Sequence, residues 1–217
     1  MTCPRSIVKA TGFWEREVSY VRSATLRGFV LLILALAHTA CFQVTYLPET
    51  TAVSGADGVR ADGCPLPAEG QTLLVNETHG FCLLYPVGYA AAEIDGESWV
   101  YVGAILNAQD SRLHVQVAEA GGRTADEVAQ ERLTEIKASL PDLELAVQSA
   151  TLAGRPAALL DGMPAQEFTR QIMVVHGDRV FTLVFMPDAP ALGDPYQRML
   201  ALYELAVATF RFTQPAS

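Results

Sequence analysis

The 217-residue chain carries 15 Lys and Arg residues against 24 Asp and Glu residues, a formal net charge of −9 at pH 7. A surface of this sign repels phosphate backbones, which excludes nucleic acid as a partner. The four cysteines form no CxxC pair and no Cys/His spacing typical of a zinc site, so the sequence indicates neither a metal nor a cofactor.

The N-terminal segment contains an uncharged run, Gly28–Ala37, directly after Arg22 and Arg27. A membrane-spanning helix needs roughly 20 apolar residues, so this shorter run is typical of a signal-peptide core. We therefore expect residues 1–40 to be a leader and signal peptide. Residues 1–20 are long for the charged region of a signal, and a start at Val21 would give an ordinary length. We expect residues 1–20 to be a mis-assigned start or disordered.

Cys41 directly follows His38, Thr39 and Ala40. This stretch resembles the lipobox of bacterial lipoproteins, in which the cysteine is lipidated and becomes the mature N-terminus, although His38 stands where that family prefers Leu, Val or Ile. The resemblance implies a lipid anchor at Cys41 that holds the protein on the outer face of the bacterial cytoplasmic membrane. The alternatives are an uncleaved single-pass membrane anchor, with Cys41 a plain buried thiol, and ordinary secretion.

Residues 41–217 hold 10 basic and 22 acidic residues, a formal charge of −12. We expect residues 41–70 to be the lipidated cysteine and a flexible tether, since they are rich in Pro and Gly. Residues 71–213 form the globular domain and 214–217 a tail. An exported domain permits a disulfide between Cys64 and Cys82, which would close a loop of about 17 residues and contribute roughly 3 kcal/mol. The alternative is two free thiols, one of them buried in a strand.

The first half of the domain is predicted to be strands. Trp99–Leu106 is apolar on both alternations, which predicts a central strand covered on both faces. Arg112–Ala118 alternates, with His114 on its polar side. Before them, a hairpin with a four-residue loop joins Thr72–Val75 to Phe81–Tyr85.

A helix is predicted over Thr124–Leu140, where Thr124 and Glu127 match a capping box. Alternation then predicts a strand over Leu143–Gln148 and another over Ala157–Leu160.

The strongest hairpin is Phe168–Met186, in which Gly177-Asp178 form a two-residue turn. That turn sets a register in which Val174 opposes Phe181. Both faces of the hairpin are apolar, so each must be covered. A last helix is predicted with Asp194 as its N-cap, followed by an edge strand at Phe210–Phe212.

Two motifs resemble PsbP-like proteins and related bacterial lipoproteins of the DcrB and LpqN kind. Phe81–Tyr89 looks like their F-x-x-x-YP-x-G-W stretch, with Tyr89 in place of the usual Trp, and Leu152–Ala157 looks like their L-x-G-x-P-A turn. The resemblance covers about residues 71–213. It implies an α+β fold, an α/β/α sandwich of one largely antiparallel sheet flanked by helices, and a non-enzymatic accessory or binding role. No functional residue carries over.

The sequence indicates no catalytic residue and no known catalytic motif. His79, His114 and His176 are each expected to be solvated, and the only local His–carboxylate pairs are His79 with Glu77 and His176 with Asp178. Asp95, Glu97 and Trp99 could form an exposed acidic-aromatic patch. The alternative is a loop at the start of a strand, with Trp99 buried in the core. Any ligand site is expected between the last helix and the sheet.

The leading hypothesis is therefore a lipid-anchored extracytoplasmic domain that binds an envelope protein or a small ligand without catalysis. The first alternative is an envelope hydrolase with a site built from loops, which would need convergent titratable groups. The second is a single-pass anchored protein whose N-terminal helix is not cleaved.

Overall fold

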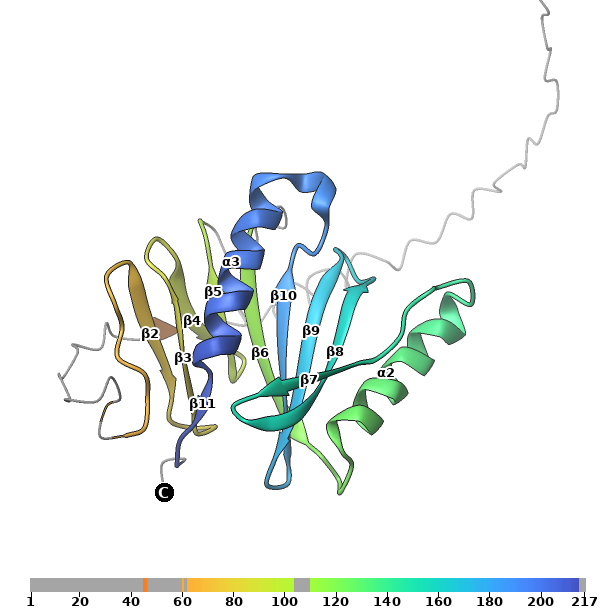
Figure 1. The fold of residues 1–217 in the computed structure, drawn as a ribbon, viewed down its shortest axis with the longest axis horizontal. Helices are drawn as coiled ribbons and strands as arrows, with labels where there is room; N and C mark the ends of the chain where they lie inside the picture. The colour runs from red at the N-terminus through yellow and green to blue at the C-terminus, as the bar shows by residue number, and fades with distance from the viewer. Residues whose placement is uncertain (1–44, 47–59, 61, 104–109, 215–217) are drawn as a thin grey trace, which may run out of the picture. The chain divides into compact units, whose positions relative to one another are not determined.

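The structure is a computed structural model that describes residues 45–46, 60, 62–103 and 110–214. The predicted signal peptide, Cys41 and most of the predicted tether lie outside the described residues. Two β-sheets and two α-helices make up the described part (Figure 1).

The larger sheet has eight strands, and all of its neighbouring strands are antiparallel. In spatial order they are β1 (Thr45–Tyr46), β4 (Ala90–Ile94), β5 (Glu97–Tyr101), β6 (Arg112–Glu119), β10 (Arg179–Met186), β9 (Thr169–His176), β8 (Arg155–Met163) and β7 (Gln148–Leu152). The predicted strand at 99–106 ends earlier, at Tyr101, and its last residues lie outside the described part.

The hairpin of β9 and β10 forms the centre of this sheet and has the predicted register. Val174 pairs with Phe181 and Ile172 with Leu183, as the two-residue turn at Gly177-Asp178 requires. Gly177 has a positive φ of 64°, the backbone conformation that this turn type needs at its first central position. The predicted need to cover both faces is also confirmed.

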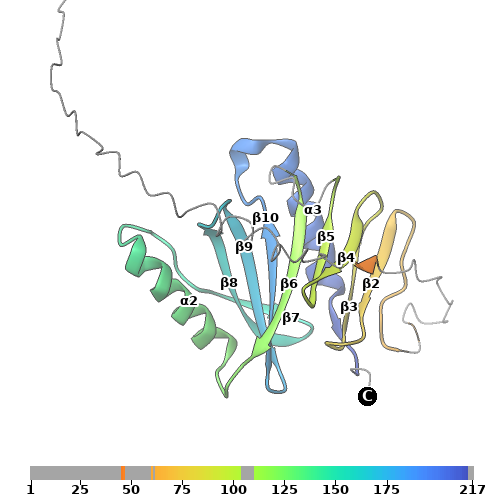
Figure 2. The same cartoon turned by 180° about the vertical axis from the view of Figure 1, so that it is seen from behind.

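Helix α3 (Asp194–Thr209) covers one face of the hairpin, and helix α2 (Ala125–Ser139) covers the other (Figures 1 and 2). Ile172, Phe181 and Leu183 belong to the core cluster under α3. Met173 and Val180, of the opposite alternation, belong to the cluster under α2. The predicted sandwich of helix, sheet and helix is therefore confirmed.

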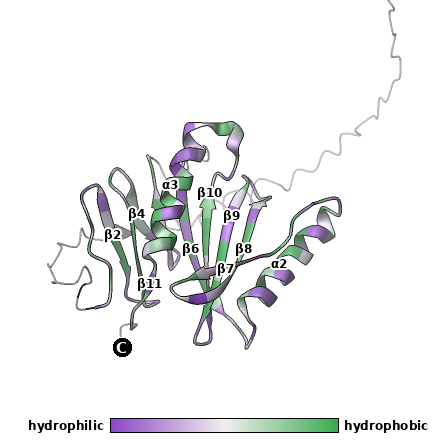
Figure 3. Ribbon diagram, viewed as in Figure 1, coloured by the Kyte–Doolittle hydropathy of each residue, from purple (hydrophilic) through white to green (hydrophobic). Residues whose placement is uncertain are grey.

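Helix α2 begins with the predicted capping box. The backbone N–H of Glu127 donates to Thr124 Oγ1 over 3.2 Å, and the backbone N–H of Thr124 donates to a Glu127 carboxylate oxygen over 2.7 Å. Ala125, Ala129 and Leu133 form its buried stripe. Polar and apolar residues alternate along both helices, as amphipathic helices require (Figure 3).

A second, three-stranded sheet was not predicted from the sequence. It contains the expected first hairpin, β2 (Gln71–Asn76) and β3 (Phe81–Pro86), together with β11 (Arg211–Phe212). Helix α3 contacts β3 as well as the larger sheet, so its apolar residues pack against both sheets in one core cluster. The predicted edge strand at the end of the chain is confirmed as β11.

Cys64 and Cys82 form the predicted disulfide. Both are completely buried, in a small cluster with Leu73 and Leu84 on the side of β2 and β3 away from the main core. Two parts of the predicted tether thus join the domain: residue 64 through this bond, and residues 45–46 by pairing with β4.

Two local predictions were wrong. The strand predicted at Leu143–Gln148 begins only at Gln148. The apolar residues Leu145 and Val147, whose alternation predicted the strand, pack against the cluster under α2 without being in a strand. The N-cap of α3 is Gly193, not Asp194, which is already helical. A short 3-10 helix, η1 (Pro190–Leu192), precedes that cap and sets where α3 begins.

Candidate functional site

A hollow lined by several polar and charged side chains lies on the α2 side of the larger sheet. Helix α2 contacts β8 and β9 there, which leaves the β5 and β6 part of the same face without a helix over it among the described residues. We call this hollow the α2-side groove. It has a volume of about 340 Å³, within the range of small-ligand sites. Its lining consists of Trp99, Arg112, His114, Gln116, Arg132, Ala165, Gln166, Glu167, Thr169, Gln171, Val184 and Met186.

The strand register explains why these side chains gather. His114 on β6 pairs with Val184 on β10, which in turn pairs with Gln171 on β9. Side chains directly opposite one another in neighbouring strands share a face. Trp99 on β5 pairs with His114 and continues the same row.

His114 is not solvated, and that prediction was wrong. The residue is 7% exposed, and its ring stacks on the Trp99 indole with a centroid distance of 3.9 Å. Its Nε2 lies 2.5 Å from a carboxylate oxygen of Glu97, two residues before Trp99 on β5. His114 therefore lines the groove and does not face bulk water.

Burial decides the charge state of the His114 imidazole, and the contact with Glu97 decides its tautomer. Burial lowers the pKa of His114 below its usual value, and this outweighs the opposing effect of the Glu97 carboxylate and its hydrogen bond. The ring is therefore neutral at pH 7. Because Glu97 accepts the Nε2 proton, Nδ1 holds the free lone pair. Nδ1 has no hydrogen-bond partner among the described residues.

The wall of the groove opposite Trp99 contains a partly buried ion pair and a buried amide. Arg112 on β6 forms an ion pair with Glu167 in the β8–β9 loop. Gln171 is 3% exposed, and its Nε2 donates to Thr169 Oγ1 over 2.8 Å. Two buried oxygens, Gln171 Oε1 and Glu167 Oε2, accept no hydrogen bond. A buried acceptor without a partner costs about 1–3 kcal/mol, so these atoms favour a ligand or water that donates to them.

Arg132 on α2 completes the groove. Its pKa is lowered because burial desolvates the guanidinium, and the nearby carboxylate of Glu135 only partly offsets this. No carboxylate of the described residues lies within ion-pair distance of it.

The other places where the sequence indicated a possible site do not form one with the predicted contacts. The interface between α3 and the sheet, where a ligand was expected, contains closely packed aromatic rings, among them Phe81 against Phe210 and Phe185 against Tyr203. His79 is half-buried, with Nε2 3.1 Å from the Gly96 carbonyl oxygen, and His176 stacks on Phe212 at 4.1 Å. The described residues show no ion pair between His79 and Glu77 or between His176 and Asp178.

His176 also borders a hollow of about 740 Å³, larger than the α2-side groove. This hollow adjoins Asp62 and Gln214, which are next to residues outside the described part of the chain. We assign it no site. Of the acidic-aromatic residues, Asp95 is exposed in a turn, whereas Trp99 is half-buried in the α2-side groove and not in the core.

Sequence reasoning missed Glu97 as the partner of His114 because the two are 17 positions apart. The signal was present in the alternation. Glu97 and Trp99 share one side of β5, as His114 and Gln116 share one side of β6, and pairing Trp99 with His114 brings both pairs together.

Comparison with protein-family models finds no match, and neither does comparison with curated proteins. Among solved structures, the chain is similar to the solution structure of cyanobacterial PsbP (CyanoP) from Synechocystis sp. PCC 6803. The two share 14% sequence identity and a TM-score of 0.47, over 74% of this chain and 98% of that chain. At this level we transfer no residue role or activity.

No group of three or more His, Cys, Asp or Glu side chains among the described residues could hold a metal ion. None of the helices described has both the length and the apolar character to cross a membrane.

Proposed function

We propose that this protein is a lipid-anchored, extracytoplasmic domain that binds a small polar ligand in the α2-side groove without transforming it. The observation that carries the binding role is Gln171, a 97% buried amide in the groove with a carbonyl oxygen that accepts no hydrogen bond. Burying a polar group without a hydrogen-bond partner costs free energy, and a ligand that donates to this oxygen would remove that cost.

The anchor rests on the sequence. The apolar run before Cys41 and the lipobox resemblance support lipidation. The acidic domain would then lie at the outer face of the cytoplasmic membrane. An envelope protein as partner remains the alternative to a small ligand. Intact-mass analysis of the membrane-extracted chain tests the anchor: a chain that starts at Cys41 with two or three acyl groups is expected. A mass that retains residues before Cys41 and carries no acyl group would mean an uncleaved anchor.

Native mass spectrometry of the full chain, purified gently from bacterial membranes, tests the groove. A bound small molecule is expected, and Ala165→Trp should remove it, because Ala165 is an exposed loop residue at the groove and Trp would fill the opening. Ala146→Trp, at an exposed position that does not line the groove, is the control. A ligand retained by the Ala165 variant, or no ligand in any preparation, would contradict the proposal.

The His114–Glu97 pair favours a hydrolase as the second candidate, because a carboxylate that orients a neutral histidine is typical of a general base. Against it, no Ser, Thr or Cys of the described residues hydrogen-bonds to His114, so no side-chain nucleophile is activated. Turnover of chromogenic ester substrates that is abolished by His114→Ala would establish the hydrolase and overturn the binding role.

A further inference from the structure

The side chains that line the α2-side groove carry more positive than negative charge. Arg112 and Arg132 lie there with a single carboxylate, that of Glu167, which is already paired with Arg112. Arg132 is half-buried, and no carboxylate of the described residues lies within ion-pair distance of it. Glu135, on the same helix, offsets only part of its desolvation. The groove therefore contains a guanidinium without a paired anion.

Two buried oxygens of the groove lack a hydrogen-bond donor, Gln171 Oε1 and Glu167 Oε2. The orientation of the Gln171 amide is fixed by Thr169. The hydroxyl of Thr169 lies 3.4 Å from the Met163 carbonyl oxygen, which can only accept, so the hydroxyl donates there. It then accepts from Gln171 Nε2, over 2.8 Å, and leaves Oε1 toward the groove. A ligand that fits here brings donors to these oxygens.

The unpaired cation and the buried amide lie at the same end of the groove. Arg132 is on α2, and Gln171 is on β9, which α2 contacts. Trp99 on β5 is three strands away from β9, roughly 14 Å at the usual strand spacing. A small ligand can therefore contact Arg132 and Gln171 without reaching Trp99 or Glu97, and Glu97 is not among the lining residues.

This end of the groove lacks one anion and two donors. A carboxylate supplies the anion, in the planar geometry that a guanidinium binds through two parallel hydrogen bonds. Hydroxyl groups on the same molecule supply the donors. We propose that the α2-side groove binds a hydroxylated carboxylic acid, with its carboxylate on Arg132 and its hydroxyls donating to Gln171 Oε1 and Glu167 Oε2. This inference rests on the proposed binding function and specifies its ligand class.

Isothermal titration calorimetry on the full chain in detergent at pH 7.5 tests the ligand class, with titration into detergent alone as the blank. Gluconate carries a carboxylate and hydroxyls, sorbitol the hydroxyls alone, and hexanoate the carboxylate alone. We expect gluconate to bind about tenfold or more tightly than either. The formal charge of −12 on residues 41–217 repels anions, so diffuse attraction would not produce this result.

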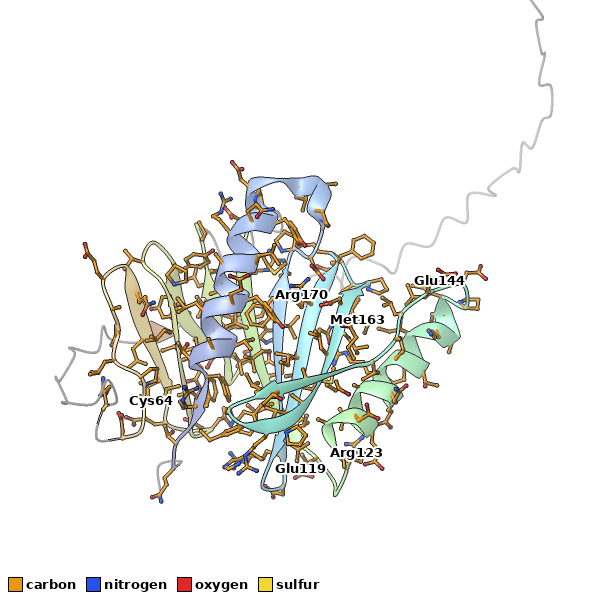
Figure 4. The ribbon with its side chains drawn as sticks, in the orientation of Figure 1. Cys64, Glu119, Arg123, Glu144, Met163 and Arg170 are labelled. Atoms are coloured by element: carbon orange, nitrogen blue, oxygen red, sulfur yellow. A yellow bond between two sulfur atoms is a disulfide. The ribbon has the colours of Figure 1, made fainter. Side chains whose placement is uncertain are left out.

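Arg132→Gln should weaken gluconate binding about tenfold or more, since it removes the cation and keeps a polar side chain. The matched control is Arg123→Gln, which makes the same change in net charge just before α2, at a residue that does not line the groove (Figure 4). It should change gluconate affinity less than about twofold. Gln171→Leu removes an acceptor and should also weaken gluconate binding. Thermal unfolding of each variant verifies that it folds.

The outcomes separate this ligand class from the proposed function. Gluconate binding that Arg132→Gln leaves unchanged, or that Arg123→Gln weakens equally, would mean that Arg132 does not hold the carboxylate, and would overturn the inference. Sorbitol or hexanoate that binds as tightly as gluconate, and is blocked by Ala165→Trp, would overturn the ligand class and leave the binding function standing. Failure of all three probes would overturn the ligand class, and the further absence of a bound molecule in native mass spectra would overturn the binding function as well.

Discussion

Gln171→Leu should stabilise the ligand-free protein, which is unusual for a change at a 97% buried position. In the native chain, Oε1 is buried without a partner, at a cost of about 1–3 kcal/mol. The variant loses the bond from Nε2 to Thr169 Oγ1, worth about 0.5–1.5 kcal/mol. Leucine keeps a similar volume and buries more apolar surface. The net expectation is a gain of about 1 kcal/mol in the free energy of unfolding.

Urea unfolding of the ligand-free full chain in detergent measures this directly. The midpoint should rise with an unchanged slope, and the melting temperature should rise by about 2–4 °C. Gln148→Leu is the matched control, because Gln148 is exposed on β7 and its change should stay within about 0.5 kcal/mol. A loss of more than about 1 kcal/mol in Gln171→Leu would mean that Oε1 is satisfied in the free protein, and the reasoning for the groove would fail.

Three further predictions test the fold and the groove. Replacing Cys64 and Cys82 with Ser should lower the free energy of unfolding by roughly 3 kcal/mol, and reductant should lower that of the native chain similarly but leave the variant unchanged. Thr124→Ala should cost about 1 kcal/mol in thermal or urea unfolding through loss of the capping box, whereas Thr134→Ala, on the exposed side of α2, should cost less. Stability should fall as pH drops below 6.5, because the lowered pKa of His114 means that the unfolded chain takes up a proton before the folded one. His114→Gln should flatten this dependence, and an unchanged profile would contradict a buried neutral ring beside Glu97 and Trp99.

Local patterns determined much of the fold. The turn at Gly177-Asp178 fixed the register of β9 and β10, and the capping box fixed the start of α2, because each depends on residues close together in sequence. The division into two sheets could not be predicted in this way. It depends on β11 pairing with β3 across about 130 residues, which leaves no local pattern.

The candidate site was harder to predict for the same reason. Alternation placed His114 on the polar side of its strand, but polar alternation cannot distinguish bulk water from a groove beside a helix. The deciding facts are that α2 covers β8 and β9, and that the β8–β9 loop brings Glu167 to Arg112. Both are contacts between segments far apart in the chain.

Hydrogen exchange tests the central claim, a ligand groove beside α2, most directly. Exchange is measured on the full chain in detergent, with and without the low-molecular-mass fraction of a bacterial envelope extract. We expect the extract to slow exchange in β5, in the first half of β6 and in residues 165–171, and to slow none of these segments in Ala165→Trp. Protection confined to other segments, or no protection at all, would contradict the claim.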